Sequence, residues 1–249
     1  MLEIDSKIYM FRTKEIYFAD YPYDVGGYAT VTFEVCPHKV DMPGFSRRGG
    51  TTLVIDLTQD LDTIWENMKK KSCRYEINRA QREGIVVKIG QNFEEFGKIY
   101  KAFWKKKVYR EARIRPEFIK YGTLFTAEID GEVVAGHLYL EDDSHIRWII
   151  GGSKRLEVDK DRSALIGRAN RLMHWEAIKY TRAKGIKEFD FGGIYTGSNK
   201  SDPRNTINTF KLSFGGTLVT RYHYEKVYSK VYKLLRYPYR LMKGIRGLR

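Results

Sequence analysis

Two short motifs in the last quarter of the chain combine charged side chains with glycines. The first is FDFGG at residues 189–193, in which Asp190 lies between two aromatic residues at the end of a predicted strand. Ligands of α/β folds gather at such strand ends, but an aspartate there also caps turns by accepting bonds from glycine amides. The second is TFKLSFGG at residues 209–216. Its Lys211 can donate to a phosphate or an oxyanion, and the alternative is a solvated helix lysine.

Basic side chains recur along a predicted helix that begins near residue 73. Arg74, Asn78 and Arg82 are four residues apart, which places them on one face. Guanidinium groups suit phosphates, so this face is a candidate diphosphate clamp. The alternative is an exposed face of ion pairs, which accounts for Arg79 and its neighbouring glutamates better than for Arg74 and Arg82.

Four further residues complete the predicted substrate-binding set. Arg147 precedes Trp148 on a predicted central strand, and Trp104 lies beside a run of three lysines. Tyr195 follows the FDFGG motif, and Phe210 precedes Lys211. For the tryptophans, packing in the core is the alternative to stacking on a sugar or base.

These residues need a scaffold, and hydrophobic periodicity predicts one. The expected strands are 7–12, 28–36, 51–57, 85–89, three strands within 124–150, 186–191 and 217–224. The expected helices are one capped by Asp60 or Asp62 and running to residue 71, a second after it, and then 93–107, 163–183 and a short one from Pro203 to 212. The order indicates an α/β (α+β) fold with an antiparallel meander rather than a doubly wound sheet.

Composition and charge limit the classes of protein and of partner that fit this sequence. The net charge is +14, with 15 Lys or Arg against 5 Asp or Glu in residues 69–115 and 9 against 1 in residues 221–249. Such basic segments favour polyanionic partners. With 42% hydrophobic residues the chain can bury a core. We find no apolar run of membrane-spanning length, no secretory signal, no nucleotide-binding glycine loop, no GxSxG, and no Cys or His spacing of a metal site. These observations predict a cytoplasmic protein without a metal.

Taken together, three segments resemble the Fem-type (FemABX-like) aminoacyltransferases within the GNAT acyltransferase superfamily. They are RYEINRAQREGIVV at 74–87, LMHWEAIKY at 172–180 followed by Gly185, and the pair FDFGG and FK..FGG. The likeness runs in the same order from about residue 51 to 217. It implies a GNAT-like fold, with a mixed and mostly antiparallel sheet flanked by helices.

The resemblance also implies a reaction, which is transfer of an amino acid or acyl group to an amine of a cell-envelope (peptidoglycan-type) precursor. Lys211 and Asp190 are then the expected catalytic residues, stabilising the oxyanion and orienting the amine. No tightly bound cofactor is expected. The co-substrate is either aminoacyl-tRNA or acyl-CoA. The coenzyme A loop pattern survives only in degenerate form at residues 162–167.

The expected domains are an abbreviated N-terminal GNAT-like half at 1–110, an acyltransferase domain at 111–224 and a basic amphipathic helix at 225–249. Family members with two complete halves are longer, so the first half is expected to be shortened. The last segment mixes lysines and arginines with aliphatic and tyrosine side chains, which favours peripheral contact with an anionic inner membrane face over docking on the body. Its predicted helix is kinked at Pro238.

Three alternatives remain open on sequence alone. The first is an acyl-CoA-dependent N-acetyltransferase of another amine, with the same fold. The second is an RNA-binding module that uses the basic helices. If the protein is an aminoacyltransferase, tRNA is a possible partner as the carrier of the donor group. The third is a membrane-peripheral interaction protein. The sequence does not specify the oligomeric state.

Overall fold

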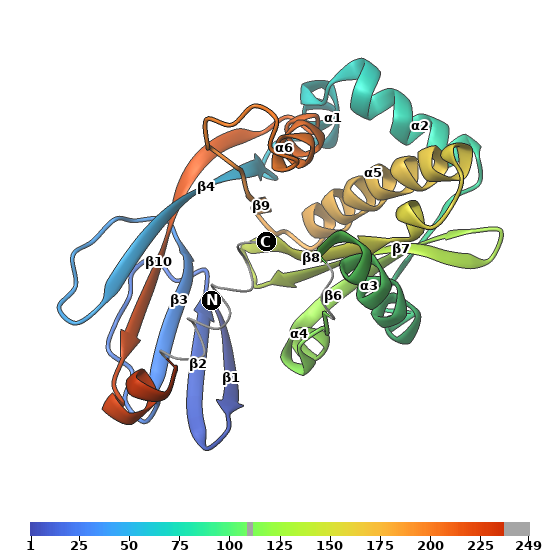
Figure 1. Ribbon diagram of the computed structural model, residues 1–249. Coiled ribbons are helices and arrows are strands. Elements are labelled where there is room, and N and C mark those ends of the chain that lie inside the picture. The colour runs from blue at the N-terminus through green and yellow to red at the C-terminus, as the bar shows by residue number, and fades with distance from the viewer. Residues whose placement is uncertain (109–111, 237–249) are drawn as a thin grey trace. The chain divides into compact units, whose positions relative to one another are not determined.

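The chain forms two compact units in the computed structural model, which describes residues 1–108 and 112–236. Unit 1 contains Met1–Gly50 and the segment from Thr220 onward, and unit 2 is Thr51–Val219. Strands β4 (Ser46–Asp56) and β10 (Thr217–Val227) each begin in one unit and end in the other. Figure 1 shows the elements along the chain.

Unit 1 is built on the strand order β1-β2-β3-β10. Strands β1 (Leu2–Ile8) and β2 (Phe11–Tyr17) form an antiparallel hairpin, β2 pairs in parallel with β3 (Thr30–Cys36), and β3 pairs antiparallel with β10. The prediction of a single strand at 7–12 is wrong, because Tyr9 and Met10 form the hairpin turn. Tyr9 takes a left-handed backbone with φ 55°.

Hydrogen bonds between residues far apart in the sequence connect the two chain segments of unit 1. The hydroxyl of Tyr224, on β10, donates to the carbonyl of His38 at 2.8 Å and accepts from the amide of Val40 at 2.8 Å. Tyr224 is buried against Val31 and Phe33 of β3. The last strand therefore fixes the loop that follows β3.

Unit 2 contains the larger part of the sheet, in the order β4-β9-β8-β7-β6-β5. The remaining strands are β5 (Val86–Ile89), β6 (Gly122–Ile129), β7 (Glu132–Glu141), β8 (His145–Ser153) and β9 (Glu188–Gly193). Neighbours pair antiparallel except β8 and β9, which are parallel. The predicted mixed, mostly antiparallel sheet with its three-strand meander is confirmed.

The predicted helices of unit 2 occur in the predicted order with shifted ends, and the structure adds a short helix at 116–121 and a 3-10 turn at 154–156 that were not predicted. They are α1 (Leu61–Asn67), the π-helical turn η1 (Lys70–Arg74), α2 (Tyr75–Arg82), α3 (Phe93–Val108), α4 (Pro116–Tyr121), the short 3-10 turn η2 (Lys154–Leu156), α5 (Lys160–Ala183) and α6 (Arg204–Leu212). Asp60 caps α1 by accepting from the Thr63 amide at 2.7 Å. The predicted extension of this helix to residue 71 is wrong, because Met68 has an extended backbone that ends α1 at Asn67.

Helices α3 and α5 cover opposite faces of the sheet (Figure 1). On β7, Gly136 faces α3 so closely that a Cβ there would lie 2.4 Å from the ring of Phe96. The next residue, His137, points to the other face and bonds Asn170 of α5. This alternation follows from the two-residue period of a strand. It places the side chains of β7 alternately under α3 and under α5.

The two units differ from the domain division expected from the sequence. Helix α2 packs on α5, and α3 packs on β7 and β8, so the segment 51–108 belongs with the later strands. The correspondence of residues 1–110 to a shortened GNAT-like half stays a prediction. Residues 230–236 are helical, whereas the rest of the expected tail helix, including Pro238, lies outside the described residues.

Candidate active site

In the centre of unit 2 the hydrogen-bond ladder between two parallel strands stops before the strands end, and we call this break in the ladder the gap. Strands β8 and β9 pair only through His145 with Glu188, Ile146 with Phe189, and Arg147 with Asp190. Both strands continue beyond Arg147 and Asp190, but within the described ranges the ladder between them stops there. The backbone groups of the two strands beyond this point do not bond each other, and they lie at the carboxyl ends of two parallel strands, where ligands of α/β folds tend to bind.

Asp190 closes the base of this gap. It is 2% exposed and accepts bonds from the Thr52 hydroxyl, from Arg147 Nη1 and, at 2.6 Å, from the Gly192 amide. A carboxylate has about four lone-pair positions, and three donors fill most of them. The turn-capping alternative is thus present in the structure, together with an ion pair. This geometry favours a positioning role in which Asp190 orients Arg147 and the glycine turn.

Lys211 reaches the same place from α6. It is 7% exposed, its Nζ donates to the carbonyl of Gly193 at 2.8 Å, and it lies 5.3 Å from the ring centre of Trp148. The alternative of a solvated helix lysine is wrong. Burial, reinforced by the nearby Arg147 charge and opposed by Asp190, lowers the pKa of Lys211 to about 8. At neutral pH it is a largely protonated ammonium in a site of low polarity, where charges interact strongly.

The glycine turn brings the backbone close to this ammonium. Gly192 has φ 77°, and a Cβ there would lie 3.3 Å from the Trp148 carbonyl oxygen and 3.7 Å from Lys211 Nζ. Glycine adopts this left-handed backbone without strain, which permits the tight turn after β9. Glycine at this position therefore lets the backbone lie close to both Lys211 and Arg147, whose Nη2 would be 3.8 Å from a Cβ here.

Two buried histidines lie under the gap, and sequence reasoning did not assign them. His174 Nδ1 bonds the hydroxyl of Tyr139 at 2.7 Å, and His137 Nε2 bonds Asn170 at 2.9 Å, with 4.2 Å between the imidazole centres. Burial lowers the pKa of His137 to about 3 and that of His174 well below its usual value. Both are therefore neutral near pH 7. Their remaining nitrogens have no partner among the described residues.

Aromatic rings connect these histidines to the motif residues. Phe210, one of the predicted substrate-binding residues, lies 5.6 Å from His174 and 5.0 Å from the Arg171 guanidinium. Arg171 also donates to the carbonyl of Ser72 at 2.8 Å, which ties α5 to η1. Trp148 contacts both histidines. The structure thus brings together four predicted residues, Arg147, Asp190, Phe210 and Lys211. Trp148 packs beside them, in contact with both histidines and with Lys211.

The predicted arginine face lies on η1 and α2. Arg74 pairs with Glu66 of α1 at 2.5 Å, whereas Asn78 and Arg82 are exposed. Arg79 pairs with Glu83 at 2.8 Å, as the ion-pair alternative predicts. The diphosphate-clamp role of Arg74, Asn78 and Arg82 stays a prediction.

The other two predicted substrate-binding residues lie in packed surroundings. Trp104 belongs to a cluster between α3 and the opposite sheet face, next to Tyr100 and Ile150. Tyr195 follows β9, and its ring lies 3.9 Å from the Arg204 guanidinium. The backbone of Tyr195 exchanges two bonds with the amide of Asn208, at 3.0 and 2.7 Å, which fixes the loop to α6. The substrate roles of both residues stay predictions.

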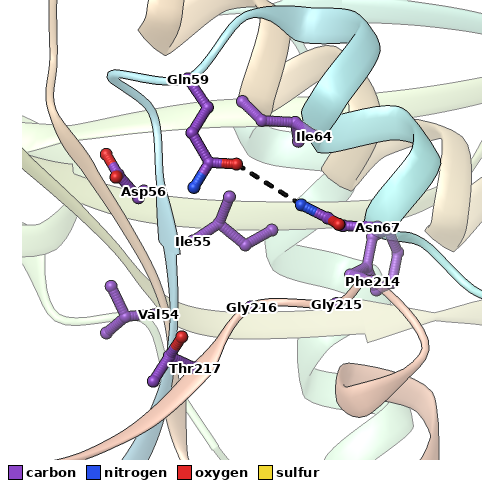
Figure 2. A pocket seen from close by; sticks show the side chains of 10 residues that line it. All are labelled: Val54, Ile55, Asp56, Gln59, Ile64, Asn67, Phe214, Gly215, Gly216 and Thr217. Carbon is purple, nitrogen blue, oxygen red and sulfur yellow. Dashed lines mark hydrogen bonds between the residues drawn. The ribbon is translucent and has the colours of Figure 1, made fainter.

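A cavity of about 350 Å³ lies beside the second glycine motif. Figure 2 shows Gln59 and Asn67 facing each other on one side of it, and Asp56 and Thr217 around the rest. Its remaining wall is formed by β4, α1 and the segment 214–217. The carboxylate and amides make it suited to polar or cationic groups.

Across residues 1–108 and 112–236, no group of three or more His, Cys, Asp or Glu side chains is arranged to hold a metal ion. In the same ranges no helix combines the length and apolar character required to cross a bilayer.

The chain belongs to the GNAT acetyltransferase family, whose domain model, described as "Acetyltransferase (GNAT) domain", matches residues 67–200. It is an acyltransferase of GNAT type. Among solved structures it is similar to FemX, with a TM-score of 0.64, 14% identity, and coverage of 83% of this chain and 74% of FemX. These values show a shared fold and agree with the Fem-like resemblance of the motifs.

Two further structures share this fold. One is the C-terminal domain of a putative lysylphosphatidylglycerol synthetase from Agrobacterium fabrum, with a TM-score of 0.52, 14% identity, and coverage of 83% of this chain and 69% of that one. The other is L-PGS from Bacillus licheniformis, with a TM-score of 0.51, 15% identity, and coverage of 83% and 70%. No curated protein matches the sequence.

Proposed function

We propose that this acyltransferase moves an aminoacyl group from a carrier ester to an amine of a cell-envelope, peptidoglycan-type precursor. The observation that carries the proposal is the buried ammonium of Lys211 in the gap beyond Arg147 and Asp190. The Fem-like motifs, and the fold shared with FemX and two lysylphosphatidylglycerol-synthetase structures, support the aminoacyl version.

In the proposed reaction the acceptor ammonium first loses a proton to solvent water, and the lone pair of the resulting amine attacks the carbonyl carbon of the donor. The nitrogen then loses a second proton, which balances the proton that the carrier oxygen takes up. The carbon–oxygen bond to the carrier then breaks, and the carrier leaves with the electron pair and takes up a proton as a hydroxyl group. The Lys211 ammonium stabilises the oxyanion formed between these steps. Asp190 acts as a positioning residue through Arg147 and the Gly192 turn.

The start of α5 favours aminoacyl-tRNA over acyl-CoA as the donor. Asp159 accepts bonds from the amides of Asp161 and Arg162 at 2.9 and 3.0 Å. A pyrophosphate seated on this helix start would have to displace a carboxylate from those donors. The degenerate coenzyme A pattern at 162–167 lies inside α5 rather than in a loop.

The cavity in Figure 2 is the proposed site for the cationic amine before transfer. Hydrogen bonds from Thr58 keep the pKa of Asp56 below its usual value, so this carboxylate is ionised and can attract an ammonium group. The cavity also adjoins Phe214, whose ring contacts His174 under the gap. Phe214 thus connects the cavity to the aromatic residues beneath Lys211.

The second candidate is an acyl-CoA-dependent N-acyltransferase, which the acetyltransferase description of the matched family favours. Here the bond that breaks joins carbon to sulfur, and the carrier leaves as a thiol. Binding separates the two donors. Isothermal titration with coenzyme A and with total aminoacyl-tRNA is expected to give binding only to the RNA. Micromolar affinity for coenzyme A with indifference to tRNA would overturn the aminoacyl version.

Transfer of radiolabelled amino acids from aminoacyl-tRNA to precursor peptides, with acetyl-CoA as the parallel donor, tests the site. Lys211→Ala is expected to lower turnover by roughly a hundred- to a thousand-fold, the usual effect of removing one oxyanion donor. Lys187→Ala, which removes an exposed lysine of unit 2, is the matched control. Full activity in both Lys211→Ala and Asp190→Asn would refute the assignment.

A further inference from the structure

Unit 1 presents large apolar side chains to solvent at two elements, the β1–β2 turn and the helical segment 230–236. Tyr9 is 91% exposed, Met10 83% and Leu234 74%. Ile8, Val231 and Leu235 are exposed as well. Single exposed apolar residues are common on proteins, but a group of them on adjoining elements marks an interaction site. We call these six residues the apolar tip.

Packing inside unit 1 brings the two elements together. Ile8 pairs with Phe11 across the hairpin, and the ring of Phe11 meets that of Tyr232 edge to face at 5.2 Å. Since Tyr232 is the buried residue of this helical segment, its neighbours Val231, Leu234 and Leu235 form a stripe on a different side, at spacings of three and four. Figure 1 shows the helix at the same end of unit 1 as the β1–β2 turn.

The surroundings of the apolar tip are cationic. The stretches 7–12 and 230–236 contain no Asp or Glu in the sequence. Their charged residues are Lys7, Arg12, Lys230, Lys233 and Arg236. The last of these pairs with Glu225, whereas the side chains of the other four are exposed. The surface therefore has an apolar centre and a basic rim.

We propose that the apolar tip inserts into the headgroup region of an anionic lipid bilayer. Aliphatic and tyrosine side chains enter the boundary between headgroups and acyl chains, while a lysine and arginine rim binds anionic headgroups. Two copies of the same basic rim repel each other, so the charge argues against self-association through this face. The inference is independent of the proposed acyl transfer, and it adds the β1–β2 turn to a contact that the sequence indicated only for the tail.

Site-specific labelling tests the insertion. Both native cysteines are buried, so Met10→Cys in the full chain gives one accessible thiol for an environment-sensitive fluorophore. Phosphatidylglycerol vesicles are expected to shift its emission to the blue, and phosphatidylcholine vesicles are not. Leu156→Cys, at an exposed leucine of unit 2, is the matched control and is expected to show no shift.

Vesicle co-sedimentation measures the energetics. Lys230→Gln and Lys233→Gln are each expected to weaken binding to phosphatidylglycerol vesicles roughly five-fold, the usual effect of one charge near an anionic surface. Tyr9→Ser with Met10→Ser is expected to weaken it by at least about ten-fold. The matched control for charge is Lys187→Gln.

Three results would overturn the proposal. The first is equal blue shifts at positions 10 and 156, or none at either. The second is vesicle binding that survives the Tyr9→Ser, Met10→Ser variant unchanged. The third is a dimer in sedimentation equilibrium without lipid that dissociates in this variant, which would assign the apolar tip to a second copy of the chain. Circular dichroism of each variant verifies that unit 1 remains folded.

Discussion

Replacing Lys211 by methionine is expected to remove activity and to stabilise the protein near neutral pH. In the unfolded chain the lysine has its ordinary pKa of 10.5, while in the folded protein the value is about 8. Folding therefore pays for holding a proton on a buried amine. This lowering of the Lys211 pKa corresponds to a loss of about 3 kcal/mol in the free energy of unfolding at neutral pH. Methionine has similar length and no charge, so it removes this cost.

The pH dependence of the unfolding free energy separates the contribution of the Lys211 charge from other effects of the substitution. Between its two pKa values the unfolded state binds more protons than the folded state, so this contribution to stability rises with pH. From about pH 7 to about pH 10 the wild-type protein is expected to gain about 2.5 kcal/mol relative to Lys211→Met. The Gly193 carbonyl loses its donor in the variant, at a cost of about 1–3 kcal/mol, but that cost does not change with pH.

Urea unfolding of both proteins at several pH values measures the difference, and all other titrating groups cancel between them. A difference in unfolding free energy that stays constant from neutral to alkaline pH would refute the displaced pKa. Activity gives a second measurement. If the ammonium is the active form, turnover of the wild-type protein falls above about pH 8. A rise through the same range would mean that the neutral amine is the working form.

Three other substitutions test the scaffold. Gly216→Ala would place a Cβ 2.5 Å from a carbonyl of β4 at φ 89°, so we expect a loss of about 3 kcal/mol in urea unfolding, against under about 1 kcal/mol for Gly193→Ala, where nothing is near. Asp159→Ala removes the cap of α5 and is expected to cost about 1 kcal/mol in the same assay. Arg147→Met leaves the Asp190 carboxylate buried without its cation, and about 3 kcal/mol is the expected loss in thermal and urea unfolding. Adding Asp190→Asn, which removes the unpaired charge and keeps an acceptor for Thr52 and Gly192, is expected to restore part of that loss, and no recovery would contradict the ion-pair account.

Local periodicity predicted most elements of unit 2 because each of these carries its own pattern, whereas the six-residue helix α4 is too short to show one. The alternation along β6, the Asp130-Gly131 turn and the spacing along α5 all depend on neighbours in sequence. The β1–β2 hairpin escaped prediction for the same reason, since Tyr9 and Met10 are not typical turn residues. Only the folded hairpin shows that Tyr9 accepts a left-handed backbone.

The sequence motifs predicted two residues of the candidate site, but not the residues that contact them in the fold. Asp190 and Lys211 belong to recognisable segments, but Thr52, which bonds Asp190, lies 138 residues away on β4. No local pattern reports such a pairing. His137 and His174 come together because one faces α5 from a strand and the other faces the sheet from α5, a relation that requires the register of both.

The way in which unit 1 is assembled from both parts of the chain has a consequence for synthesis on the ribosome. Strand β3 is translated early, but its partner β10 follows only after all of unit 2, and the bond between Val40 and Tyr224 spans 184 residues. At bacterial or eukaryotic elongation rates this is a delay of roughly ten to forty seconds. Unit 2 can fold during that time, while the edge of β3 waits unpaired and open to wrong partners. Translation speed through residues 51–219 thus becomes a determinant of yield.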